Sequence, residues 1–285
     1  MYISVKKNVS SCFFSIPALL LIPYLVTALL NGADRALVIH APDAEACLPV
    51  VLSLQIEADF EPEAVKAQAV IARSNMYREL EEGISIFDIL GEAGEKVRHT
   101  YGLWKLSQKM EEMAVYERAS EETKGQVLTY QGELKLVPYH EISCGTTRDG
   151  VQVLHSEEYA YLVSVDSSQD KKAPDYLGSS YIAARQMPKK LVIKKRDSAG
   201  YVTALTADGS WLEGEAFRQG MGLTSANFTV QKIGSQYRFL CKGKGHGIGF
   251  SQYGGNVLAK EGDDWEEILE NYFPKMELRD IQEME

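Results

Sequence analysis

An uncharged stretch of eighteen residues near the amino terminus, Phe13 to Leu30, limits what this chain can fold into more than any other feature. As a helix it would be about 27 Å long, close to the roughly 30 Å of a bilayer's hydrocarbon core. Lys6 and Lys7 precede it, whereas the charges just after it cancel. Because positive flanks stay on the cytoplasmic side, we expect a single-pass cell-membrane anchor, with residues 1–12 inside and the remainder outside.

A cleaved signal peptide is the alternative. Such a peptide ends in a small-x-small pattern, which Leu30-Asn31-Gly32-Ala33 matches poorly. Two prolines inside the stretch, Pro17 and Pro23, weaken a membrane helix without forbidding it. Under either interpretation the folded part lies outside the cytoplasmic membrane.

The composition is that of a globular protein. The chain has 285 residues, of which 45% are hydrophobic and 25% charged, which excludes wholesale disorder. Its net charge of -10 argues against a nucleic-acid partner, because phosphates would be repelled. Four cysteines are too few and too scattered for a disulfide scaffold.

Helix signals dominate the first half of the exported part. Pro62 in a first turn and Gly83 at the end predict a helix between them. Apolar residues at helical spacing predict a second helix over Tyr101 to Glu122, and a last one is expected over Asp264 to Tyr272. The apolar run Cys47 to Ile56 is a strand or a helix, since periodicity does not decide.

Hairpin signals dominate the second half. GQVLTY and ELKLVPYH flank Gln131-Gly132, and LVIKKR and YVTALTA flank residues 197–200. A glycine-rich loop follows at Gly243 to Gly255. The fold class is therefore α+β, a mixed helix and antiparallel-hairpin domain at 47–278. A connector at 31–46 joins it to the anchor, and residues 279–285 form a tail.

Two segments suit a functional site. His140 to Thr147 follows a predicted strand, where loops present polar side chains to a cleft, although a plain turn with a buried thiol fits equally well. Alternating glycines surround His246, and they let a backbone approach a ligand or another backbone closely. The second segment lacks the Gly-Lys-Ser/Thr ending of a phosphate-binding loop.

The sequence predicts neither a metal nor another cofactor. His140, Cys144, Cys241 and His246 are suitable zinc ligands by type, but their spacing matches no compact zinc motif. The hypothesis that Cys144 is a nucleophile with His140 as its base has even less support than the zinc site, because strand residues four apart need not face each other.

Acidic and amide residues gather before the first helix. Complementation of the helix dipole explains Glu61 and Glu63 without any chemistry. It does not explain Gln55 or Glu57, which precede the helix.

Four blocks of the sequence resemble the stage II sporulation protein D family. FEPEAVKAQAVIARSNMY is similar to the family's F-x-x-E-A-L-K-A-Q-A-V-A-A-R-T-Y, and GKGHGIGFSQYGG is similar to its G-x-G-H-G-x-G-M-S-Q-Y-G-A. GQVLTYQGELKLVPYHEISCGTTRDG and GEAFRQGMGLTSANFTV match two further family segments in the right order. The resemblance covers most of Cys47 to Leu278.

This resemblance implies a membrane-anchored lytic transglycosylase of the cell wall. Such enzymes cleave peptidoglycan glycan strands stripped of their peptides during engulfment in sporulation, and close a 1,6-anhydro ring on the muramyl product. One carboxyl group suffices, because it first protonates the leaving oxygen and then takes the proton of the attacking hydroxyl. No second carboxylate is required, unlike in ordinary glycosidases.

The family's acid is the Glu of A-A-E-M-P-x-x-F, and the position five before Phe60 is Gln55 here. An amide does not shuttle protons, so either Glu57 takes the role or the site is inactive. The alternative function is therefore a catalytically weak glycan-binding protein that positions another cell-wall hydrolase or amidase. The resemblance assigns substrate binding to residues that match family positions: Arg73, His140, Ser143, Thr146, His246, Ser251, Gln252 and Tyr253.

Overall fold

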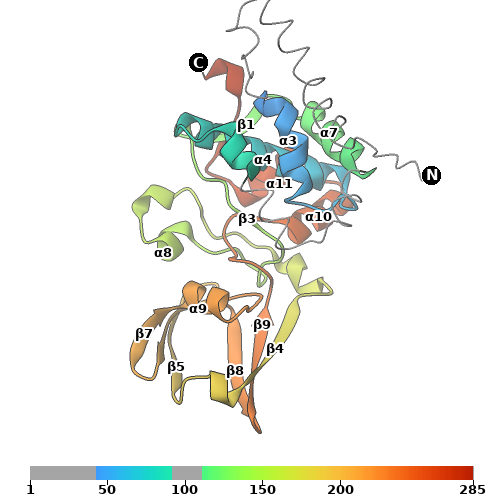
Figure 1. Ribbon diagram of the computed structural model, residues 1–285. Coiled ribbons are helices and arrows are strands. Elements are labelled where there is room, and N and C mark those ends of the chain that lie inside the picture. The colour runs from blue at the N-terminus through green and yellow to red at the C-terminus, as the bar shows by residue number, and fades with distance from the viewer. Residues whose placement is uncertain (1–42, 92–110, 285) are drawn as a thin grey trace, which may run out of the picture. The chain divides into compact units, whose positions relative to one another are not determined.

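A computed structural model describes residues 43–91 and 111–284 of the chain, and its elements mix helices with antiparallel sheets (Figure 1). The α+β class predicted from the sequence is thus confirmed for the described part. The predicted anchor at 13–30 and residues 101–110 of the second predicted helix lie outside the described ranges. Within those ranges, no helix combines the length and the apolar character needed to cross a bilayer.

Three helices form the first layer of the helical part: α3 (Ala44–Ser53), α4 (Pro62–Glu81) and α7 (Met113–Glu122). The ambiguous apolar run is therefore a helix, which Asp43 caps by accepting a hydrogen bond from the Glu45 backbone N–H. Helix α4 begins at Pro62 as predicted, because proline is tolerated where a helical N–H has no partner. Its residues are buried on most sides by α3, α7 and the strands beside it.

Two more helices complete the helical part, α10 (Gln252–Glu261) and α11 (Trp265–Tyr272). Helix α11 was predicted, and Asp264 starts it with a capping box to Glu267. Helix α10 was not predicted, because its first turn contains Gly254 and Gly255 and reads as loop. Both glycines are required by packing: a Cβ at Gly254 would lie 2.1 Å from the Tyr272 hydroxyl.

Short strands connect these helices. The predicted hairpin about Gln131-Gly132 is confirmed as β1 (Gln126–Tyr130) and β2 (Glu133–Leu134), and both turn residues have positive φ. Strand β11 (Glu277–Asp280) pairs antiparallel with the other side of β1. Strands β3 (Tyr139–His140) and β10 (Phe250–Ser251) pair in parallel. Helix α3 and strand β11 thus extend past positions 47 and 278, the ends that the sequence suggested for the domain.

The β part of the chain holds two three-stranded sheets. One has the order β4-β9-β8, and the other contains the second predicted hairpin, confirmed as β5-β6, with β7 at its edge. Phe217 of the short helix α9 packs with Phe228 and Phe239 in the core of this part. The bounds are β4 (Leu177–Ala183), β5 (Leu191–Arg196), β6 (Val202–Ala207), β7 (Ser210–Glu213), α9 (Gly214–Gly220), β8 (Phe228–Ile233) and β9 (Gln236–Lys242).

The remaining elements are short. They are α8 (Gly150–Leu154) and the 3-10 turns η1 (Glu157–Tyr159), η2 (Ser168–Lys172), η3 (Ala184–Gln186) and η4 (Ile281–Glu283).

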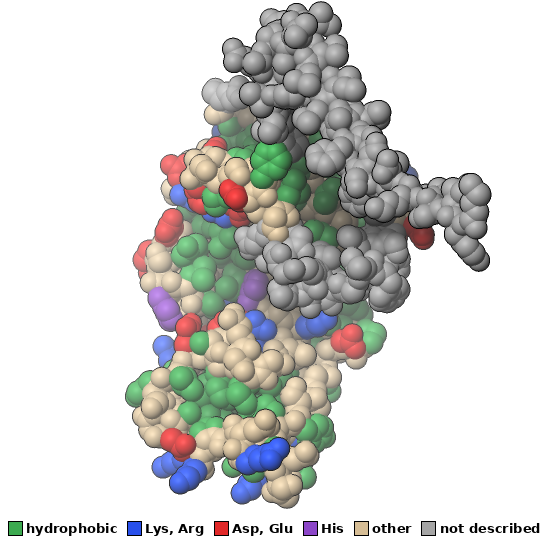
Figure 2. All heavy atoms as spheres, in the orientation of Figure 1, with side chains coloured by type: hydrophobic (Ala, Val, Ile, Leu, Met, Phe, Trp, Pro, Cys, Tyr) green, Lys and Arg blue, Asp and Glu red, His purple; other side chains and the backbone are tan. Residues whose placement is uncertain are grey.

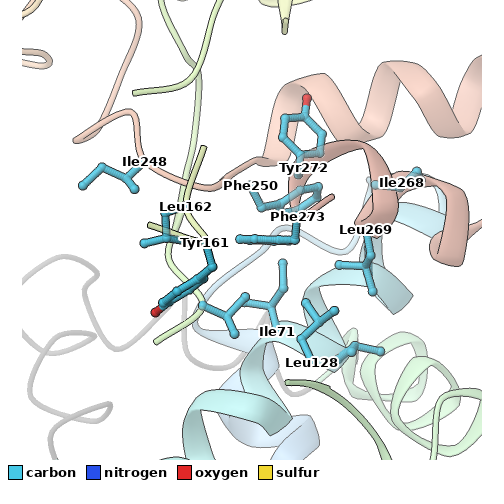
Figure 3. Close-up of a cluster of buried hydrophobic side chains, with 13 residues drawn as sticks. Ile71, Leu128, Tyr161, Leu162, Ile248, Phe250, Ile268, Leu269, Tyr272 and Phe273 are labelled. Atoms are coloured by element: carbon cyan, nitrogen blue, oxygen red, sulfur yellow. The ribbon is translucent and has the colours of Figure 1, made fainter. Parts of the chain in front are cut away.

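The largest apolar cluster joins segments that are far apart in the sequence (Figure 3). Ile71 of α4 lies beside Leu128 of β1, and aromatic rings from the carboxyl-terminal segments close the cluster. Phe250 and Tyr272 meet edge to face with centroids 5.2 Å apart. This packing fixes the start of α10 against α4, and the candidate site is built at that junction.

Candidate functional site

A cleft of about 670 Å³ opens where the end of α3, strand β3, the glycine-rich loop and the start of α10 meet. This volume is in the range of ligand-binding clefts. The cleft brings together six of the ten site residues predicted from the sequence: Gln55, Glu57, His140, His246, Gln252 and Tyr253. Further lining residues come from the loop before α4 and from the segment 173–175.

A network of three amides fixes the position of Gln55. Gln68 Nε2, on α4, donates to Gln55 Oε1 at 2.8 Å. Gln252 Nε2, in the first turn of α10, donates to the Gln55 carbonyl at 2.7 Å and to Gln68 Oε1 at 3.0 Å. Gln68 is completely buried. Because buried amides are costly without partners, this network holds residue 55 in one place on the cleft wall.

Two neutral imidazoles lie side by side in the cleft, the rings of His140 and His246, with centroids 5.7 Å apart. His140 Nδ1 donates to the Ile248 carbonyl at 3.1 Å, and His140 Nε2 is buried without a partner. Burial lowers the pKa of His140 to about 3, helped by His246 nearby. Burial is also the main cause that lowers the pKa of His246, whose Nδ1 accepts from the Ile248 N–H at 3.1 Å. Both rings are therefore hydrogen-bonding groups and not cations at neutral pH.

Acidic side chains line the cleft, and none of the described residues that line it is Lys or Arg. The acids are Glu57, Asp59, Glu141 and Asp175. Glu141 forms an ion pair with Lys244. The cleft thus favours neutral ligands over anionic ones.

Arg73 does not line the cleft. It is completely buried on α4, where its Nε pairs with Glu45 at 2.8 Å. Its terminal nitrogens donate to the carbonyls of Ser120 and Thr123 at 2.8 and 2.7 Å. A guanidinium that satisfies the last carbonyls of α7 stabilises the helix packing and has no reach toward a ligand.

Ser143 and Ser251 also lie behind the cleft, and both bind Asp170. The Ser143 N–H and the Ser251 hydroxyl each donate to Asp170 Oδ2 at 2.7 Å, and Ser167 adds a third bond at 3.0 Å. Burial raises the pKa of Asp170 against the effect of these donors. The carboxyl group ties the end of β3 to the start of α10. Thr146 lies in a different hollow, described below.

Close approach explains two glycines of the loop. Gly245 has φ +107°, and a Cβ there would lie 2.8 Å from the Cβ of His140. Gly249 has φ +70°, and its Cβ would lie 2.2 Å from the Pro138 carbonyl oxygen. The loop can therefore lie against strand β3 only with glycine at these positions.

A buried ion pair supports the loop from the β part. Arg148 Nε lies 2.6 Å from Asp197 Oδ2, and each side chain is only 3% exposed. Arg148 also donates to the His246 carbonyl at 2.9 Å and stacks on the ring of Tyr201. The position of His246 in the cleft thus depends on a residue pair outside it.

The cysteines do not join the histidines. Cys144 Sγ lies 3.0 Å from the Ala199 carbonyl in a small cluster with Tyr201, and Cys241 belongs to the core of the β part. Over residues 43–91 and 111–284, no group of three or more His, Cys, Asp and Glu side chains is arranged to hold a metal ion. The zinc ligand set considered from the sequence does not assemble here.

Sequence reasoning missed Gln68, Arg148 and Asp170. Gln68 left one signal, because it is an uncharged amide among the alanines of a helix that is buried on most sides. Arg148 and Asp170 left none, since the contacts that tie them to the site, with Asp197 and Ser251, span 49 and 81 residues.

The chain is similar to known sporulation proteins. A family model described as Stage II sporulation protein matches residues 33–130. Stage II sporulation protein D of Bacillus subtilis (strain 168) is 29% identical over 258 residues, which cover 82% of this chain and 73% of that protein. The same protein of Bacillus amyloliquefaciens is 27% identical over 263 residues, 84% of this chain and 74% of that protein.

A more distant relative is the amidase enhancer of Bacillus subtilis (strain 168). It is 24% identical over 292 residues, which cover 79% of this chain and 39% of the enhancer. The family model and the two sporulation proteins, which align with most of the chain, thus show that this chain is similar to stage II sporulation protein D.

Proposed function

We propose that this chain is a cell-wall protein that binds peptidoglycan glycan strands in the cleft and carries an amide where the family's transglycosylases carry their acid. The single observation behind the proposal is the 2.8 Å hydrogen bond from Gln68 to Gln55. It supports the assignment of residue 55 to the cleft wall, at the position that the family motif gives to the catalytic carboxyl group. Hydrogen-bonding side chains and the ring of Tyr253 suit a neutral sugar surface.

Loss of the carboxyl group changes the chemistry available to the cleft. Strand cleavage by ring closure needs one group that gives a proton to the leaving oxygen and takes one from the attacking hydroxyl. The Gln55 amide has no titratable proton at neutral pH. The two histidines do not replace it, since burial keeps both in the neutral form.

A lytic transglycosylase that uses Glu57 is the second candidate function. The observation in its favour is that Glu57 lines the same cleft two residues after Gln55. A carboxyl group there reaches the same ligand if the strand binds with the scissile bond displaced toward the loop before α4.

The proposed setting is the outer side of the cytoplasmic membrane in a sporulating cell, with residues 13–30 as a single-pass anchor. One relative is named amidase enhancer, so we also propose that this protein, once bound to glycan, positions a cell-wall amidase. Both parts rest on the family relationship.

Binding of peptide-free glycan strands by the purified full chain tests the first proposal. Tyr253→Ala removes a ring from the cleft wall and should weaken binding about tenfold, the scale of a lost aromatic contact with its hydrogen bond. Trp211→Ala is the matched control, because Trp211 is 68% exposed on β7 and lies outside the cleft. Equal binding by both variants would contradict the proposed binding site.

Release of 1,6-anhydro-muramyl product separates the two candidates. The binding proposal expects no release above background from the wild type. Release that disappears in Glu57→Gln would establish the second candidate instead.

A further inference from the structure

A second hollow, the basic hollow, lies beside the β part and is separate from the cleft. It has a volume of about 750 Å³. Lys171, Arg196 and Lys242 line it, against one acid, Asp166. The cleft has the opposite lining, with four acids and neither Lys nor Arg. Two hollows of similar size in one domain thus differ in the sign of their charge.

The three cations of the basic hollow have no carboxylate partner among the described residues. Asp166 forms no ion pair with these three cations, and its Oδ2 accepts from the Ser168 hydroxyl and N–H at 2.8 and 3.3 Å; its single charge offsets at most one of the three. Arg196 is held in place by two carbonyls, those of Gly200 and Phe228, each at 2.7 Å. Asp197 is the nearest negative charge that acts on Arg196, and that carboxylate is already paired with Arg148. A guanidinium oriented in this way, without an ion pair of its own, can bind an anion.

The basic hollow belongs to a basic region of an acidic chain. Residues 177–242, from β4 to β9, contain ten Lys and Arg but four Asp and Glu, whereas the whole chain has a net charge of -10. Figure 2 shows Lys and Arg side chains gathered at the end of the β part, away from the helices. Such a separation of charge attracts an anionic ligand to one part of the surface.

The basic hollow continues onto one face of the β4-β9-β8 sheet. Lys242 and Leu240 of β9 and Thr229 of β8 line it, and Leu240 lies opposite Thr229 on the side that faces away from the core. Further along the same face, Arg238 lies opposite Tyr181, whose side chain is 56% exposed. An exposed ring offers a flat face to a sugar, and the cations beside it attract a carboxylate.

We infer that the basic hollow binds the carboxylate groups of a peptide-free glycan strand; the inference rests on the proposed function and adds a second contact to it. An amidase that removes a stem peptide leaves a free lactyl carboxylate on each muramic acid. The acidic cleft repels that group, and the basic hollow attracts it. The protein thereby distinguishes stripped strands from peptide-bearing ones, whose carboxyl groups at this position are amides.

The shape of the hollow favours a glycan over an anionic membrane surface. A bilayer requires a flat or protruding basic face, whereas these cations line a depression together with the hydroxyl groups of Thr146 and Tyr176 and the amide of Asn227. Hydroxyl and amide groups inside a depression suit a sugar.

Two matched double variants of the full chain test the inference. Lys171→Glu with Lys242→Glu reverses two charges in the hollow, and Lys172→Glu with Lys195→Glu makes the same change at exposed positions outside it. We expect the first variant to bind peptide-free strands about tenfold more weakly, with a reduced salt dependence. Binding of chitohexaose, which has no carboxylate, should not change. The second variant should bind both ligands like the wild type.

Three results would overturn the inference: equal weakening by both double variants, no weakening by either, or loss of phosphatidylglycerol vesicle binding in the first variant with glycan binding intact. Tyr253→Ala keeps this test apart from the proposed cleft. Normal chitohexaose binding in Tyr253→Ala, with strand binding lost only in the first double variant, would reject the cleft and retain the hollow. If Tyr253→Ala weakened chitohexaose binding while the first double variant bound strands like the wild type, the cleft would be retained and the hollow rejected.

Discussion

Gln68 donates a hydrogen bond of 2.8 Å to Oε1 of Gln55, from the middle of a buried helix to the wall of the cleft. The same donor would serve a glutamate at position 55 equally well, because a carboxylate oxygen accepts what the amide oxygen accepts. If position 55 is the acid position, as we propose, this bond would be available to a restored carboxyl group. Four predictions test this site and the contacts that support it.

Gln55→Glu should create or raise the release of anhydro-muramyl product by on the order of 10²-fold, because it restores a group able to give and take a proton. The gain is limited by the bond from Gln68, which favours the ionised form and so opposes protonation at neutral pH. Product release is measured by chromatography of digested peptide-free strands. Gln55→Leu is the control and should stay at background. A wild type whose activity is lost in Glu57→Gln would contradict this prediction.

Gln68→Leu should lower the free energy of unfolding by about 1–3 kcal/mol, because it leaves the amide of Gln55 and one bond of Gln252 unsatisfied. It should also weaken glycan binding, since residue 55 and α10 lose their common anchor. Urea unfolding and strand binding measure the two effects. Gln219→Leu, at an exposed position of α9, should change neither. Normal binding in a destabilised Gln68→Leu would make Gln68 a purely structural residue.

Asp197→Ala should cost about 3 kcal/mol of unfolding free energy, because it removes the nearer carboxylate from the buried Arg148 and leaves Glu215, at 3.9 Å, as a weaker partner. Chemical denaturation checks the value. Glu261→Ala, which removes an exposed carboxylate that pairs with no described residue, should stay within about 0.5 kcal/mol of the wild type. Replacing both members, Arg148→Met with Asp197→Leu, should recover part of the loss. A small effect of Asp197→Ala alone would mean that the pair contributes little.

His140 should make the protein less stable as the pH falls below 6.5. Its folded-state pKa of about 3 lies under the ordinary value of 6.5, so the unfolded chain binds the proton first. The stability that the neutral ring provides is complete above pH 6.5 and should fall by about 2 kcal/mol at pH 5. The measurement is the difference in unfolding free energy between wild type and His140→Asn at pH 7.5 and 5. A difference that does not change with pH would show that His140 titrates normally.

The structure also changes how His246 is tested. The sequence suggests that His246→Ala should weaken glycan binding with the thermal midpoint nearly unchanged. In the structure His246 Nδ1 accepts from the Ile248 N–H, so alanine would leave a backbone donor without its partner. A stability loss of about 1–3 kcal/mol is therefore expected as well. Tyr253 is the better probe, because its side chain lines the cleft and makes no hydrogen bond to another described residue.

Local chemistry in the sequence determined much of the fold. The proline at the start of α4, the Gln131-Gly132 turn and the capping residue Asp264 each act within a few positions of themselves, so the elements they mark were predictable. Six of the ten predicted site residues were also found in one cleft, since the family motifs select them. Helix α10 escaped prediction because its glycines are explained only by what packs on them.

Tertiary structure alone decided which polar groups meet. Gln252 reaches Gln55 and Gln68 across 197 and 184 residues of chain, and no local pattern encodes a contact of that length. Arg73 and His140 both match family motifs. Burial against the end of α7 makes Arg73 a structural residue, whereas His140 lies in the cleft. The physical reason is that periodicity determines whether a side chain is buried, while its partner depends on how distant segments pack together.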